Sequence, residues 1–178
     1  MIKRTITILV LLTLMPIFSY AVNLQPQVEI KNHTLILNGY GIRKKMFFSI
    51  YECGLYLPSK TSSYEDVIKV DNKNIRLHFL YKKLTPEDIK KTFKEAIEKN
   101  SHDKLDSNTI QKFLSFFTFD IVSGDKIDLY FDKDILTVYH NNKAIGSIEN
   151  KILSKAIIDI YIGANPIDVS LKNKLLGN

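Results

Sequence analysis

Cysteine is almost absent from this chain of 178 residues. Cys53 is the only one, so no disulfide bond can form within the chain. It lies among apolar residues, and no basic side chain stands near it in the sequence. We therefore expect a small buried side chain instead of a catalytic thiol.

Long hydrophobic runs are also missing, except near the start of the chain. Residues 6–15 are almost wholly apolar, and 19–21 supply small residues at the −3 and −1 positions of a cleavage site. This is the pattern of a secretory signal peptide, and the run is too short for a spanning helix, which needs roughly 20 residues. We predict that residues 1–21 are cleaved after Ala21. Residues 22–178 would then be one domain, periplasmic or secreted, with no membrane span in the mature chain.

Positive charge is present but does not gather into long runs. Lysine and arginine number 25 against 19 aspartate and glutamate residues, and most lysines are scattered among acids. The basic clusters are short: 43–45, 82–83 and 90–91. This pattern argues against a nucleic-acid partner and predicts a solvated, soluble surface on what we expect to be a monomer.

The motifs of common catalytic sites are missing as well. The four histidines are isolated in the sequence, without the spacing of zinc ligands. They are His33, His78, His102 and His140. No serine stands in the glycine elbow of a hydrolase, and no glycine-rich phosphate loop is present. The sequence thus predicts no metal and no cofactor.

The remaining periodicity predicts an α+β fold. Strands are expected at residues 28–30, 34–37, within 38–58, and at 74–81, 127–131, 135–140 and 144–148. Helices are expected over 64–70, from 85 to 100 or 101, from 107 through 117, from 150 to 163, and from 166 to 177. Hairpins connect most strands, which favours an antiparallel sheet with helices packed on one face.

The clearest helix signal begins at Thr85. Thr85 is a suitable N-cap, Pro86 suits the first helical position, and Glu87 and Asp88 favour the positive end of the helix dipole. An apolar stripe at helical spacing follows, which we interpret as core packing.

Three blocks of the sequence resemble a known family. They are "LNGYGIRKK…FSIYECGLYLP" (37–58), "FLYKKLTPEDIKKTFKEAIEKN" (79–100) and "GSIENKILSKAIIDIYIGANPIDVSLKNKLLG" (146–177). Their order and spacing resemble the chalcone isomerase-like proteins, in particular an exported bacterial branch. The resemblance implies an open-faced β-sandwich, in which a large antiparallel sheet curls around helices and a cleft lies between them. Plant enzymes of this group cyclise chalcones to flavanones, whereas other relatives bind fatty acids.

The resemblance singles out Arg43. In the enzymes the matching arginine polarises the flavonoid oxyanion, and in the fatty-acid binders it holds the carboxylate. Both roles need a permanently charged, planar donor group. We expect Arg43 at the floor of the cleft, where a ligand anion would compensate its burial. From the residues alone, an arginine that extends to solvent beside Lys44 and Lys45 is the alternative.

Tyr51 falls where the enzymes place a threonine that positions a catalytic water. A tyrosine there is more similar to the fatty-acid binders, whose tyrosine hydroxyl joins the arginine on the carboxylate. Eight residues of extended strand span about 26 Å, so Tyr51 and Arg43 can meet only if the chain reverses near residues 43–46. Without that reversal Tyr51 would be a core aromatic residue.

Other positions of the enzymes are not kept. The tyrosine near the start of the long helix is replaced by the stretch 85–88, and the asparagine two turns later falls near Phe93 or Lys94. The hydroxyl residue of the late helix falls near Ile160 or Tyr161.

We therefore predict a non-catalytic site formed by Arg43, Tyr51 and Tyr161, which binds a small apolar anionic ligand such as a fatty acid. Two alternatives stay open. One is an isomerase, of the intramolecular lyase type, that acts on an enone or phenolic substrate. The other is a structural protein of the cell envelope.

Overall fold

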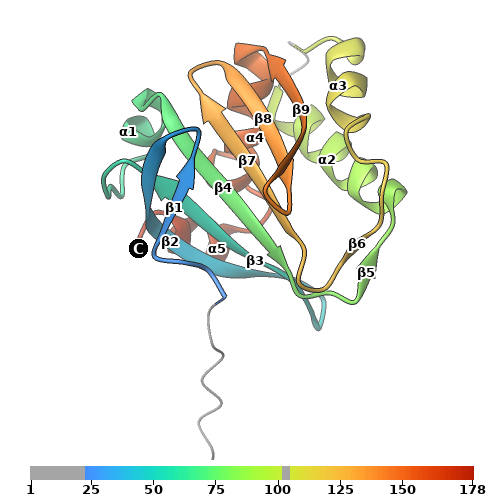
Figure 1. Ribbon diagram of the computed structural model, residues 1–178, viewed down its shortest axis with the longest axis horizontal. Helices are drawn as coiled ribbons and strands as arrows, with labels where there is room; N and C mark the ends of the chain where they lie inside the picture. The colour runs from blue at the N-terminus through green and yellow to red at the C-terminus, as the bar shows by residue number, and fades with distance from the viewer. Residues whose placement is uncertain (1–22, 102–104) are drawn as a thin grey trace, which may run out of the picture.

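The computed structural model describes residues 23–101 and 105–178, so the predicted signal peptide lies outside the described residues. Over these residues the chain forms a seven-stranded sheet in the order β1-β2-β3-β4-β7-β8-β9, with every neighbouring pair antiparallel (Figure 1). Its strands are β1 (Gln27–Ile30), β2 (His33–Lys45), β3 (Phe48–Leu57), β4 (Asn72–Phe79), β7 (Lys126–Asp132), β8 (Ile135–His140) and β9 (Lys143–Glu149). The short strands β5 (Lys83–Leu84) and β6 (Ile121–Val122) pair separately.

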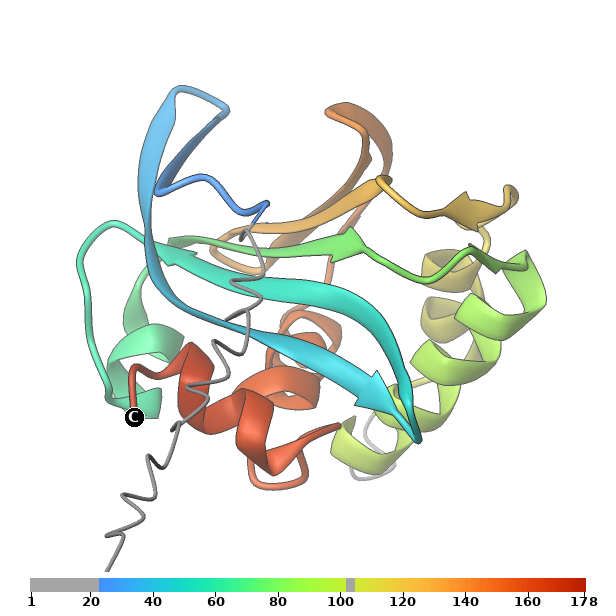
Figure 2. The ribbon, with the colours of Figure 1, turned by 90° about the horizontal axis from the view of Figure 1, so that it is seen from below.

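The helices cover one face of this curled sheet (Figure 2). They are α1 (Tyr64–Lys69), α2 (Pro86–Ser101), α3 (Ser107–Leu114), α4 (Lys151–Ile162) and α5 (Val169–Leu175). Helix α4 contacts both α2 and α5, and α5 packs on β2. The predicted α+β class with helices on an antiparallel sheet is therefore confirmed. None of the helices over the described residues is long and apolar enough to cross a bilayer.

Capping chemistry sets the starts of α2 and α4 where the sequence predicted them, whereas α5 begins at Val169, after its cap Asp168, and not at 166. The Asp88 amide donates to the Thr85 hydroxyl oxygen at 3.2 Å, and the Leu153 amide donates to the side chain of Asn150 at 2.9 Å. Each bond satisfies a donor that the first turn leaves unpaired.

Strand boundaries were predicted less well. The first turn lies at Lys31 and Asn32, both with positive φ, so β2 begins at His33, one residue before the strand expected at 34–37. The strand expected at 74–81 ends at Phe79, because the next two amides, those of Leu80 and Tyr81, turn away to the Ile50 carbonyl. The helix expected to include Phe117 ends at Leu114, although Phe117 is still buried.

A close approach between β2 and α5 positions one end of the site. A Cβ atom on Gly39 would lie 2.1 Å from the Lys174 carbonyl oxygen, and one on Gly41 would lie 2.9 Å from the Leu171 side chain. Only glycine therefore lets α5 pack this tightly against the helix-facing side of β2. The packing brings the N-terminus of α5 beside Arg43.

The outer face of the sheet buries a polar cluster that the sequence did not reveal. Arg76 on β4 pairs with Asp128 on β7, with Nε–Oδ1 and Nη2–Oδ2 distances of 2.8 and 3.0 Å. The side-chain amide of Asn74 also donates to Asp128 Oδ1, at 2.7 Å. Beside them the His78 Nδ1 lies 3.2 Å from Glu52 Oε2.

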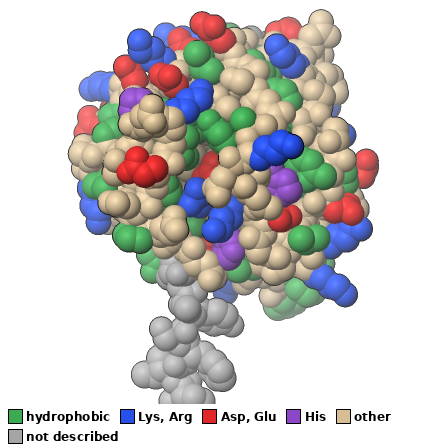
Figure 3. Space-filling model, in the orientation of Figure 1, with side chains coloured by type: hydrophobic (Ala, Val, Ile, Leu, Met, Phe, Trp, Pro, Cys, Tyr) green, Lys and Arg blue, Asp and Glu red, His purple; other side chains and the backbone are tan. Residues whose placement is uncertain are grey.

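The N-terminal segment and β1 help to cover this outer face. The Asn23 amide donates to Glu52 at 3.1 Å, and the Tyr56 hydroxyl donates to the Gln25 carbonyl at 2.9 Å. A small apolar cluster accompanies these contacts: Val28, Ile30, Leu35, Tyr56 and Tyr130. The surface seen from this side mixes acidic and basic side chains without a large field of one sign (Figure 3).

Candidate functional site

The chain reversal that the site requires is present. Strands β2 and β3 form a hairpin that turns at Met46 and Phe47, and its register places Arg43 directly opposite Tyr51. Both side chains are therefore on the helix-facing side of the sheet. A register shift lies between Arg43 and Lys44, so the strand pairing next to the turn is irregular.

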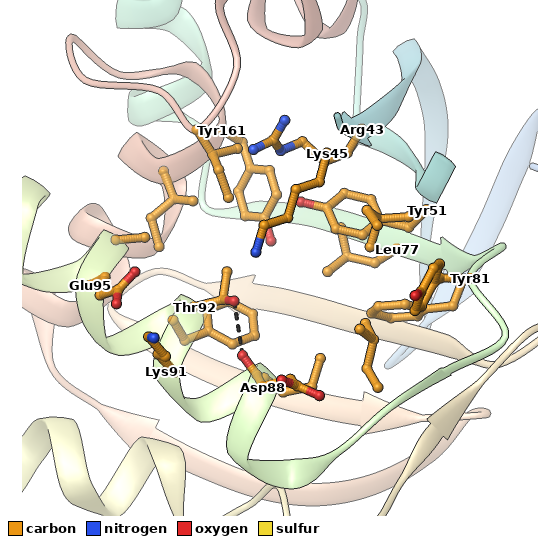
Figure 4. A pocket seen from close by; sticks show the side chains of 18 of the residues that line it. Arg43, Lys45, Tyr51, Leu77, Tyr81, Asp88, Lys91, Thr92, Glu95 and Tyr161 are labelled. Atoms are coloured by element: carbon orange, nitrogen blue, oxygen red, sulfur yellow. Dashed lines mark hydrogen bonds between the residues drawn. The ribbon is translucent and has the colours of Figure 1, made fainter. Parts of the chain in front are cut away.

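A cavity of about 820 Å³ lies between this hairpin, β4, α2 and α4 (Figure 4). Its walls are largely aliphatic and aromatic: Ile50, Leu77, Phe79, Ile89, Phe93, Ile160 and Ile167 are among the lining residues. Arg43, Tyr51 and Tyr161 line the same cavity. The structure thus brings together the three residues predicted for the site.

Arg43 differs from its predicted setting. Its Nη1 lies 3.3 Å from Asp168 Oδ2, and Nη1 also contacts the Lys44 carbonyl. Its side chain is 22% exposed. The expectation of a buried arginine at the cleft floor, balanced only by a ligand anion, was wrong: Asp168 supplies a counter-charge, and water reaches part of the guanidinium group.

The Tyr51 and Tyr161 side chains point toward each other inside the cavity (Figure 4). Burial raises the pKa of Tyr51 well above its ordinary value, while the nearby Arg43 lowers it slightly. Burial likewise raises the pKa of Tyr161, and Tyr51 raises it further. Both hydroxyls therefore stay protonated near neutral pH and can donate hydrogen bonds to an anion.

The charges that line the cavity favour an anionic ligand. Five cationic side chains stand against two carboxylates, those of Asp88 and Glu95. The cations are Arg43, Lys45, Lys83, Lys91 and Lys99. Lys45 directs its amine into the space near the two tyrosines (Figure 4).

Sequence reasoning missed two of these contributors. Lys45 stands two residues after Arg43. Residues two apart in a strand lie on the same face, so this spacing could have suggested Lys45 as a second cation of the site. Asp168 falls within the first residues of the helix predicted over 166–177, and it does cap a helix: the Leu171 amide donates to its Oδ1 at 3.0 Å. Its pairing with Arg43 spans 125 positions and left no local signal.

The positions that matter in the enzymes are differently occupied. The Thr85 hydroxyl donates to Asp88 at 2.9 Å as part of the helix cap, and Phe93 belongs to the core. Thr92 lines the cavity, but its hydroxyl donates to the Asp88 carbonyl oxygen, also at 2.9 Å. Over the described residues, the hydroxyls that meet in the cavity are those of Tyr51 and Tyr161.

Cys53 lies near this site but takes no part in it. It pairs with Gly41 and Leu77 across the sheet and is fully buried. Burial raises the pKa of the thiol, which keeps the reactive thiolate form scarce. Within residues 23–101 and 105–178, no group of three His, Cys, Asp or Glu side chains is arranged to hold a metal ion.

Comparison with known proteins identifies the family. Residues 19–177 match a family model described as chalcone isomerase-like. The chain belongs to the chalcone isomerase-like family. This confirms the resemblance drawn from the three sequence blocks.

One plant protein resembles this chain across most of its length, both in sequence and in its crystal structure. Fatty-acid-binding protein 1 of Arabidopsis thaliana is 27% identical over an alignment 175 residues long, and the match covers 80% of this chain. The chain spans 63% of the length of that relative. The crystal structure of the Arabidopsis thaliana fatty-acid binding protein AtFAP1 superposes with a TM-score of 0.66 at 22% identity, and the match covers 84% of this chain and 95% of that one. The predicted open-faced sandwich of this family is thereby confirmed.

Proposed function

We propose that this protein is an exported, non-catalytic binder of apolar carboxylates such as fatty acids. The observation that carries the proposal is the meeting of Arg43, Tyr51 and Tyr161 in one apolar cavity of about 820 Å³. This volume lies within the range of about 300–1,000 Å³ typical of small-molecule sites. The plant relative named above is itself described as a fatty-acid-binding protein, which supports the same ligand class here.

The side chains suggest how such a ligand would lie. The carboxylate would accept charge-assisted hydrogen bonds from Arg43 and neutral ones from the tyrosine hydroxyls. The hydrocarbon tail would run along the aliphatic and aromatic wall, where its burial supplies most of the binding free energy. Asp168 would keep its contact with the α5 amide through Oδ1 while Arg43 turns part of its donor set to the ligand.

Catalysis of the chalcone isomerase type is not favoured by this arrangement. Ring closure needs a positioned electrophile and a proton donor. Here the start of α2 offers a capping threonine, and Thr92 bonds the backbone, so the constellation of the enzymes is not reproduced. A purely structural role would leave the open, cation-lined cavity without a purpose.

Ligand extraction tests the binding proposal. Solvent extraction of the purified protein followed by mass spectrometry should recover fatty acids. The delipidated protein should bind a long-chain fatty acid much more tightly than its methyl ester, because the ester lacks the charge that Arg43 recognises. Recovery of no lipid together with no binding of added fatty acids would refute the proposal.

The proposed export rests on the sequence of residues 1–21 and has its own test. The protein recovered from the periplasm or the medium should begin at Val22 when its N-terminus is sequenced. Recovery of the uncleaved chain from the cytoplasm would contradict export without touching the ligand proposal.

A further inference from the structure

The tip of the β2–β3 hairpin is an exposed apolar point on the surface. Among the described residues, Met46 and Phe47 are the two most exposed large hydrophobic side chains, at 82% and 94%, and Phe48 follows beside them at 58%. The hairpin projects past the end of β4, away from the rest of the sheet (Figures 1 and 2). We call residues 46–48 the hairpin tip. Isolated exposed hydrophobic residues are common, but three consecutive ones at a projecting turn are not.

Neither turn chemistry nor core packing explains this composition. Met46 has a φ of 55°, in the left-handed region that disfavours most side chains. The other five non-glycine residues with positive φ in the described chain are all lysine or asparagine: Lys31, Asn32, Lys133, Asn141 and Asn142. The hairpin tip alone therefore uses an apolar residue where polar ones fit better.

Basic side chains surround the hairpin tip. Lys44 and Lys45 precede it, and both are exposed. The Tyr81 ring packs edge-on against Phe48 at 5.7 Å between centroids, which brings the exposed Lys82 and Lys83 beside the hairpin.

The charge of this surface is only partly compensated. Lys83 pairs with Asp120 at 2.7 Å, whereas Lys44, Lys45 and Lys82 form no ion pair within the part of the chain that the structure describes. An apolar point ringed by lysines complements a bilayer interface that contains anionic lipids.

The hairpin tip also forms part of the rim of the cavity. Met46 and Phe48 are exposed and line the cavity at the same time, as do Lys45 and Lys83. The apolar tip therefore borders the cavity on its solvent-exposed side. A surface bound by the tip would lie against the cavity mouth.

We propose that the hairpin tip docks this protein onto an anionic lipid bilayer, with Met46, Phe47 and Phe48 inserted at the interface and with Lys44 and Lys82 on the headgroups. An amphiphile could then pass between the bilayer and the cavity without crossing open water. The docking step stands on the surface residues alone, whereas the transfer of cargo rests on the function proposed above.

Sedimentation with lipid vesicles tests the docking. The mature protein should co-sediment with vesicles of phosphatidylcholine and phosphatidylglycerol, and much less with phosphatidylcholine alone. Phe47→Ser should weaken this binding roughly tenfold, because Phe47 would bury a large apolar surface in the interface. Replacing Lys44 and Lys82 with glutamine should reduce binding roughly fivefold for each lysine, and only on the anionic vesicles.

Matched measurements separate docking from ligand binding and from folding. Phe47 does not line the cavity, so Phe47→Ser should leave the melting temperature and the affinity for a fatty acid in free solution unchanged. Ile152→Ser removes an exposed apolar side chain from α4 and should leave vesicle binding intact. Failure of the native protein to bind the anionic vesicles, or equal binding by Phe47→Ser, would overturn the docking proposal. Vesicle binding by a protein that takes up no fatty acid would support docking and refute the proposed ligand.

Discussion

Replacing Arg43 with alanine should weaken the binding of a long-chain fatty acid by roughly 10- to 100-fold, since a hydrogen bond to a charged group contributes about 1.5–3 kcal/mol and each 1.4 kcal/mol is a factor of ten. The tail contacts along the cavity wall would remain, so binding should fall without disappearing. Isothermal titration calorimetry on the delipidated protein measures this change directly. The stability of the variant should change little, because the ion pair with Asp168 is partly exposed.

Asp168→Asn is the matched control for this experiment. Asparagine is as good an N-cap as aspartate, so its side-chain oxygen can still accept from the Leu171 amide and hold the start of α5. The substitution removes the carboxylate that competes with a ligand for Arg43, and fatty-acid affinity should stay equal or rise. An Arg43→Ala variant that binds as tightly as the native protein would show that the anion is held elsewhere.

The second large effect concerns the polar cluster on the outer face. Arg76→Leu should lower the free energy of unfolding by about 3–5 kcal/mol, because removal of one partner leaves the other charge buried without compensation. The Arg76 and Asp128 side chains are only 8% and 2% exposed, and among the described residues Asn74 is the one other side chain that donates to the carboxylate. Urea denaturation of the variant measures the loss.

The double variant Arg76→Leu with Asp128→Leu separates the pair from its surroundings. Removing both charges should recover much of the lost stability, since a well-packed apolar pair can replace a buried ion pair. A single variant whose unfolding free energy stays within 1 kcal/mol of the native value would mean that water or a rearranged neighbour compensates Asp128 after all.

Local chemistry made the helices predictable. The Thr85 and Asn150 caps lie beside the residues whose amides they bind, so the signal is contained in a few consecutive positions. The turns were harder, because a two-residue hairpin loop can shift by one position without disturbing the alternation on either side. The turn at Lys31 and Asn32 is such a case.

The site was predictable only in part. Its proposed anion-binding residues came from the resemblance to a family. The sequence analysis required a chain reversal for Arg43 to meet Tyr51, and the β2–β3 hairpin provides that reversal. The role of Asp168 depends on how closely α5 approaches β2. Gly39 permits this close approach, but a glycine in a strand does not by itself predict which helix packs on it.

The outer face shows a different limit of the sequence. Alternation in β4 placed Arg76 and His78 opposite the core side, and polar residues in that position usually face water. Their neighbours Glu52 and Tyr56 are in turn bonded by a distant chain segment, at Asn23 and Gln25, which helps to cover this face. Coverage by distant segments is a tertiary property, and strand periodicity does not contain it.

The enclosed sulfur of Cys53 has a practical consequence for any study of this molecule. A disulfide reagent in solution reaches that sulfur only when the middle of the sheet opens. In the closed sheet the side chain is fully buried, and its raised pKa keeps the thiol protonated and unreactive at neutral pH. The rate of modification under native conditions therefore reports the opening of the central strands. Since the chain has one cysteine, this reporter needs no engineering and has no competing signal.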